Sequence, residues 1–133
     1  MKDRSELMRM QNERKKVFIG MVFEGKTAEQ IHTEIEELKQ KAIEKWPETE
    51  GYTFVTSFDH YVPNPEFKER IRMVDEWDND VRRNHLSQSL RQMSGCERAI
   101  FSVDWCMCSF ATFQHEFALY TQMQLIDMSE MYG

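Results

Sequence analysis

The sequence lacks any apolar run approaching the ~18 residues that a membrane-spanning helix needs, so it predicts no transmembrane span. Residues 1–16 are rich in charge and contain no apolar core of a signal peptide, and we therefore expect a cytoplasmic protein. Cysteine is scarce. Cys96, Cys106 and Cys108 are the three cysteines, and in that compartment we expect reduced thiols rather than disulfides.

The sequence also has no excess of basic residues over acidic ones. The chain has 17 Lys and Arg against 23 Asp and Glu, a net charge of −6. Because neutralising phosphates requires clustered basic side chains, this balance argues against a nucleic-acid partner. There are no repeats and no low-complexity tracts, and 133 residues suit a single domain over 1–133, with residues 1–15 as an N-terminal helix or arm.

Apolar patterning predicts alternating strands and helices. We expect strands at residues 16–23, 52–58 and 98–103, and a short fourth strand at 125–128. Helices are expected from Thr27 to the residue before Pro47, over much of 66–93 with a break near 78–80, and over 110–122; a loop fills 59–65. Long crossovers between strands imply a parallel α/β sheet with helices on both faces.

The first helix has the clearest local signals. Thr27 and Gln30 fit a capping box, in which Thr occupies the N-cap and Gln the N3 position. Pro47 ends the helix, and Gly95 ends the helix that precedes the third strand. One apolar stripe runs along the first helix at steps of three and four, formed by Ile31, Ile35, Leu38, Ala42 and Trp46.

The same region matches the pattern of a phosphate-binding motif. GMVFEGKT matches G-x-x-x-x-G-K-[ST], with Gly20, Gly25, Lys26 and Thr27 at the defining positions, between a strand and a helix. A P-loop NTPase is therefore one interpretation. Residues 21–24 are bulky, however, and favour continued strand over a curled phosphate loop. Gly25, Lys26 and the helix N-terminus still offer positive potential to an anionic or polar ligand group.

Residues 97–120 predict a ligand site, because a strand ends there and a helix begins. Asp104 ends the strand and either binds a ribose or caps the helix. The spacing of three phenylalanines predicts the buried side of that helix: Phe110, Phe113 and Phe117. Gln114 lies at the edge of this side, so its side chain can face the site. Glu116 lies roughly 160° from Gln114 and is expected towards solvent or a neighbouring subunit.

Zinc is a further alternative in this stretch. His115 is interpreted as a surface or interface histidine, and with Cys106 and Cys108 it offers only three possible ligands without a second cysteine pair. We therefore expect no metal and no cofactor.

Three segments together resemble one family. FIGMVFEGKTAEQI, LSQSLRQMSGCERAIFSVDW and SFATFQHEFA are similar to the corresponding motifs of small nucleoside 2-deoxyribosyltransferase-like proteins, many of them phage or prophage encoded. The resemblance covers roughly half the chain. It implies a flavodoxin-like (Rossmann-like) three-layer sandwich with four or five parallel strands, a homodimer or larger homo-oligomer, and a nucleoside, nucleotide or related ribosyl ligand.

The resemblance also places the family nucleophile, a Glu, on Gln114. His115, Glu116, Ala118 and Trp105 match their counterparts, whereas Phe110 stands for a Gly and Ser109 for an Arg. An amide has no comparable nucleophilicity but can hold a ribose hydroxyl.

The sequence therefore predicts a catalytically degenerate nucleoside- or nucleotide-binding protein. Glu116 is the weaker catalytic candidate beside Gln114. An active transferase or N-glycosidase with a rearranged site, a P-loop NTPase and a structural oligomer with a closed pocket remain as alternatives. The expected ligand-binding residues are Gly20, Met21, Phe23, Gly25, Lys26, Thr27, Ser89, Asp104, Trp105 and Cys108.

Overall fold

The computed structural model of the protein describes residues 15–57 and 79–132. Three predictions lie outside these residues: the N-terminal arm, the loop at 59–65 and the helical part of 66–78. None of the helices in the described ranges is long and apolar enough to cross a membrane.

The described residues form an α/β fold with a four-stranded, all-parallel sheet in the order β2-β1-β3-β4. This confirms the expected flavodoxin-like topology. The strands and helices alternate along the chain as β1 (Lys16–Gly20), α2 (Ala28–Lys45), η1 (Pro47–Gly51), β2 (Thr53–Thr56), α5 (Asn79–Ser94), β3 (Arg98–Phe101), η2 (Trp105–Met107), α6 (Ser109–Tyr120), β4 (Gln124–Asp127) and α7 (Met128–Tyr132).

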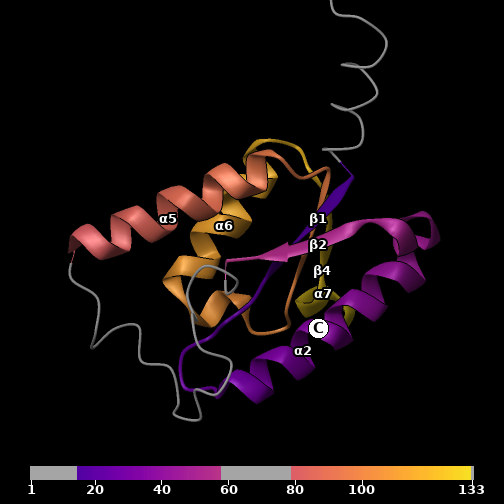
Figure 1. Ribbon diagram of the computed structural model, residues 1–133, viewed down its shortest axis with the longest axis horizontal. Helices are drawn as coiled ribbons and strands as arrows, with labels where there is room; N and C mark the ends of the chain where they lie inside the picture. The colour runs from indigo at the N-terminus through magenta and orange to yellow at the C-terminus, as the bar shows by residue number, and fades with distance from the viewer. Residues whose placement is uncertain (1–14, 58–78, 133) are drawn as a thin grey trace, which may run out of the picture.

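The sheet is the middle of three layers, with α5 and α6 on one face and α2 and α7 on the other (Figure 1). Alternate strand residues supply the two cores. Val17 and Ile19 pack with Ile31 of α2, while Phe18 packs with Met93 of α5 and Ala118 of α6. The predicted three-layer sandwich is therefore confirmed, and its apolar runs are explained by burial on both faces of a parallel sheet.

The first three strands are shorter than predicted, whereas β4 has the predicted length and begins one residue earlier. β1 ends at Gly20 and β3 at Phe101, where the last paired residues of the two strands lie opposite each other. Met21 and Phe23 remain buried, but they do so in the loop that follows β1, whereas Val103 is 52% exposed. Apolar character correctly indicated burial at residues 21–23 but not strand pairing, which depends on the neighbouring strand.

The boundaries of the helices follow their signals closely. α2 ends at Lys45, just before Pro47, and α5 ends at Ser94, just before Gly95. α6 ends two residues earlier than predicted, and Gln122 after it adopts a left-handed conformation with φ 59°. Such a residue ends a helix because it cannot continue the right-handed turn.

The predicted capping box at the start of α2 is present. The Gln30 backbone N–H donates to Thr27 Oγ1 at 3.2 Å, and the Thr27 N–H donates to Gln30 Oε1 at 2.8 Å. Both bonds satisfy backbone donors that have no partner within the helix.

Replacing Thr27 by alanine is expected to lower the free energy of unfolding by about 1 kcal/mol, because the Gln30 N–H loses its acceptor. Urea denaturation measures the change. Thr27→Ser keeps a hydroxyl and should recover most of the loss; equal losses in the two variants would contradict the capping role.

The predicted buried face of α6 is wrong at Phe113, whereas Phe110 and Phe117 are partly buried against the two cores. Phe113 is 56% exposed, and the helix instead buries Ala111, Gln114, His115 and Ala118. The small alanine side chains let α6 lie close to the sheet, and Phe113 lies on the outer side of the helix. His115, predicted at a surface or interface, is buried at 5% exposure. Glu116 is exposed, as expected.

Candidate functional site

A tight turn presents Lys26 at the carboxyl end of β1. The Lys26 N–H donates to the Phe23 carbonyl at 3.1 Å, and Gly25 between them has φ +80°. A positive φ at this turn position favours glycine, since a Cβ would be strained there. The glycine of the sequence motif is thus required by the turn that orients Lys26.

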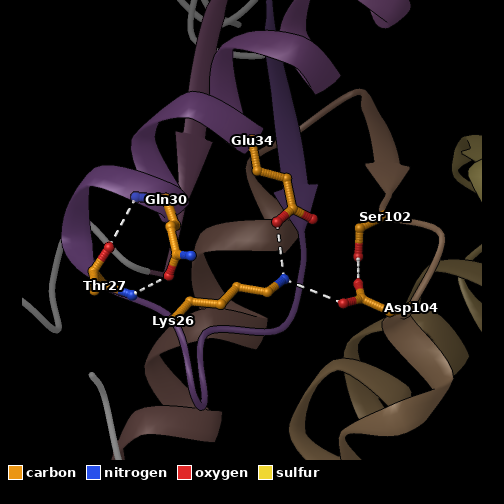
Figure 2. Close-up of polar contacts among 6 residues, drawn as sticks. All are labelled: Lys26, Thr27, Gln30, Glu34, Ser102 and Asp104. Atoms are coloured by element: carbon orange, nitrogen blue, oxygen red, sulfur yellow. Dashed lines mark hydrogen bonds and ion pairs between the residues drawn. The ribbon is translucent and has the colours of Figure 1, made fainter.

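Lys26 joins two elements that are far apart in the sequence (Figure 2). Its Nζ lies 2.8 Å from Glu34 Oε2 on α2 and 3.1 Å from Asp104 Oδ2 in the loop after β3. The buried Ser102 hydroxyl donates to the other Asp104 oxygen at 2.7 Å. We call Lys26, Glu34, Ser102 and Asp104 the lysine network.

The two carboxylates keep Lys26 charged. Burial works against the ammonium, but hydrogen bonds and charge attraction from Glu34 and Asp104 outweigh it and raise the pKa of Lys26 above its ordinary value. The side chains of Lys26, Glu34 and Asp104 are 22%, 25% and 33% exposed, so solvent still reaches all three.

The lysine network forms part of the wall of a groove of about 650 Å³ between α2 and the ends of β3 and β4. Its ionisable lining comprises four carboxylates and two ammonium groups, and apolar side chains complete it. The lining residues are Lys26, Glu29, Gln30, Thr33, Glu34, Glu37, Leu38, Lys41, Ser102, Val103, Asp104 and Met128.

One end of the groove, at Lys26 and Asp104, lies where ligands bind in this fold. The chain leaves β1 towards β2 on one side and returns to β3 on the other, so the order of the strands reverses between β1 and β3. Ligands of open α/β sheets bind outside the carboxyl ends of the strands at such a point. Lys26 follows β1 and Asp104 follows β3, and the structure brings these two side chains into contact.

A second polar cluster connects the loop after β3, α6 and β4. Asp127 accepts hydrogen bonds from Trp105 Nε1 at 2.9 Å and from the backbone and hydroxyl of Ser129, and lies 3.1 Å from His115 Nε2. The rings of Trp105 and His115 stack, with centroids 3.7 Å apart and planes 6° apart. We call Trp105, His115, Asp127 and Ser129 the aspartate cluster.

Burial raises the pKa of Asp127, but the hydrogen bonds of the aspartate cluster lower it by more. The pKa of Asp127 therefore lies below its ordinary value. The carboxylate is therefore ionised at neutral pH. Because Trp105 follows Asp104 directly and Met128 follows Asp127, this cluster fixes two segments that line the groove.

Of the expected ligand-binding residues, Lys26 and Asp104 line this groove. Gly20, Met21 and Phe23 are buried. Trp105 belongs to the aspartate cluster. Ser89 is also buried, and its hydroxyl donates to the Leu86 carbonyl at 2.8 Å. Gly25 and Thr27 shape the turn and the start of α2, and Cys108 is the N-cap residue of α6. Asp104 therefore does not cap α6.

Gln114, the position of the family nucleophile, is 1% exposed and does not line the groove. Within the described part of the chain, its Nε2 finds no hydrogen-bond partner. The resemblance placed this side chain at the site, and the phenylalanine spacing put it at the edge of the buried face, whereas it lies within that face.

Metal ligation has no support in residues 15–57 and 79–132, where no three His, Cys, Asp or Glu side chains gather as a metal site would require. The three cysteines are free thiols. Burial raises the pKa of the Cys96 thiol to about 11, so this thiol is unreactive at neutral pH.

Within the lysine network, sequence reasoning missed Glu34 and Ser102. Glu34 lies two turns into α2 on the side that carries Gln30, a helical spacing that could have indicated it. Ser102 had no comparable signal. No protein-family model, curated protein or solved structure matches this chain.

Proposed function

We propose that the protein binds a nucleoside, nucleotide or related ribosyl compound in the groove beside Lys26 and Asp104. The observation that carries this proposal is the 3.1 Å contact between these two side chains, at the point where the strand order reverses between β1 and β3. This is the place where flavodoxin-like sheets bind their ligands. The resemblance to nucleoside 2-deoxyribosyltransferase-like proteins supports a ribosyl ligand and a homo-oligomer.

The chemistry of the groove suits a sugar that carries a base. Carboxylate oxygens accept hydrogen bonds from ribose hydroxyls, and Asp104 and Glu34 supply them at one end of the groove. Leu38, Val103 and Met128 provide apolar surface for a base or for the carbons of the sugar.

We further propose that the protein is catalytically degenerate. Gln114 carries no charge and is buried away from the groove, while Glu116 is exposed on the outer side of α6. Neither side chain is placed to attack the anomeric carbon of a sugar in the groove. A retaining transfer requires a free carboxylate within bonding reach of that carbon, whereas the two carboxylates at this end of the groove, Glu34 and Asp104, are both paired with Lys26.

The test is to incubate purified protein with deoxyadenosine and thymidine, measuring binding by calorimetry and free base by chromatography. We expect binding without release of base. Asp104→Ala should weaken binding, whereas Asp80→Ala, whose side chain is 93% exposed on α5, should not. Clear turnover would establish the active transferase or glycosidase instead, and absence of binding to either compound would refute the proposal.

The variant Gln114→Glu tests whether the amide at residue 114 is the only reason for the absence of catalysis. Because residue 114 does not line the groove, we expect this variant to release no base. Recovery of activity would show that the side chain reaches the sugar.

The NTPase alternative predicts that the protein binds ATP and that Lys26→Ala abolishes this binding. The pairing of Lys26 with Glu34 and Asp104 argues against this alternative, because the lysine charge is already neutralised.

A further inference from the structure

Lys26 is the residue that the phosphate-binding motif would use, yet its charge is already matched. The ammonium contacts Glu34 and Asp104 at 2.8 and 3.1 Å, and the three side chains are between 22% and 33% exposed. Partial burial strengthens such pairs compared with fully exposed ones. A phosphate could contact Lys26 only by displacing one carboxylate or by lying beside both.

The remainder of the groove does not supply the missing positive charge. Glu29 and Glu37 also line it, and the second ammonium group, Lys41, lies 3.7 Å from Glu44. A phosphomonoester carries about −1.5 to −2 charges at neutral pH. Its entry therefore brings negative charge into a groove that already has four carboxylates against two ammonium groups.

The N-terminus of α2 is weakened as an alternative anion site. The capping box occupies the backbone N–H groups of Thr27 and Gln30. Glu29 adds a negative charge in the first helical turn, where an anionic ligand would otherwise find the positive end of the helix dipole.

We propose that Glu34 and Asp104 are specificity-determining residues that exclude phosphorylated ligands from the groove, so that it accepts a ribosyl compound only without its phosphate. The inference rests on the proposed function, since it concerns the same groove. It reverses the expectation from the motif: the lysine binds no phosphate but holds two carboxylates in place for hydroxyl groups.

Equilibrium binding of deoxyadenosine and of its 5′-monophosphate tests the inference, by calorimetry at low salt. The wild type should bind the nucleoside at least on the order of tenfold more tightly than the monophosphate. Glu34→Gln, which removes one carboxylate from Lys26 and keeps the shape, should raise the affinity for the monophosphate by on the order of tenfold. Glu36→Gln is the matched control, because Glu36 is exposed on α2 and does not line the groove.

Each outcome of these binding measurements either supports or refutes the inference. If the wild type binds the monophosphate as tightly as the nucleoside, or if Glu34→Gln keeps the wild-type preference, the inference is wrong while the proposed function stands. If neither compound binds, the proposed function fails and the inference with it. Asp104→Asn is a second variant that removes the other carboxylate from Lys26. If neither variant folds, the affinities of the wild type for the nucleoside and the monophosphate test the inference alone.

Discussion

Replacement of Asp127 by alanine is expected to lower the free energy of unfolding by about 2–4 kcal/mol. Asp127 is the common acceptor of the aspartate cluster, receiving hydrogen bonds from Trp105, His115 and Ser129. Its side chain is 8% exposed and that of His115 is 6% exposed, so water cannot readily replace the lost acceptor. Leaving a buried donor without a partner costs about 1–3 kcal/mol, more than the bond itself contributes.

Urea denaturation followed by tryptophan fluorescence measures this loss, and Trp105 lies within the cluster itself. Asp80→Ala serves as the control, because the Asp80 side chain is 93% exposed and its pair with Arg83 at 3.7 Å lies at the surface. We expect a change near zero there. Similar losses for Asp127→Ala and Asp80→Ala would contradict a supporting role of the cluster.

The same carboxylate predicts an acid dependence of stability. The pKa of Asp127 is lower in the folded protein than in the unfolded chain, so the folded state binds its proton less readily. Its contribution is fully present above the unfolded pKa of about 4 and is lost as pH falls from there through the lower folded pKa. Asp127→Asn should remove this component and flatten the decline of unfolding free energy below about pH 4.

Replacement of Gly20 by alanine is expected to cost about 1–3 kcal/mol through overpacking. A Cβ at this position would lie 3.1 Å from Cζ of Phe101 and closer still to Cε1 and Cδ1. The Phe101 ring cannot easily move away, because it is fully buried and lies against Phe18, Trp105 and His115. The glycine at the head of the phosphate-binding motif is thus required by the packing of the sheet.

Gly51→Ala is the matched control, since Gly51 is exposed and a Cβ there meets no atom within 4 Å. We expect a change within about 0.5 kcal/mol for that variant. Phe101→Leu should cost less in the Gly20→Ala background than in the wild type, because the shorter side chain relieves the overlap. Strictly additive losses in the double variant would show that residues 20 and 101 do not clash.

Local signals in the sequence predicted much of the fold. The Thr27 capping box, Pro47 and Gly95 set helix boundaries through backbone chemistry that depends on a few neighbouring residues. Strand–helix alternation then led to the parallel sheet. The placement of Lys26 and Asp104 at one edge was also predictable, because the ends of adjacent parallel strands meet there.

The sequence by itself determined that the chain is a flavodoxin-like α/β fold and that charged side chains gather beyond β1 and β3. Tertiary structure decided which face of α6 is buried, since Ala111 and Ala118 allow a close approach that outweighs the larger apolar area of Phe113. It also decided the partners of each charge. Glu34 and Asp104 meet on Lys26, and His115 and Trp105 meet on Asp127, through contacts between residues that sequence spacing does not relate.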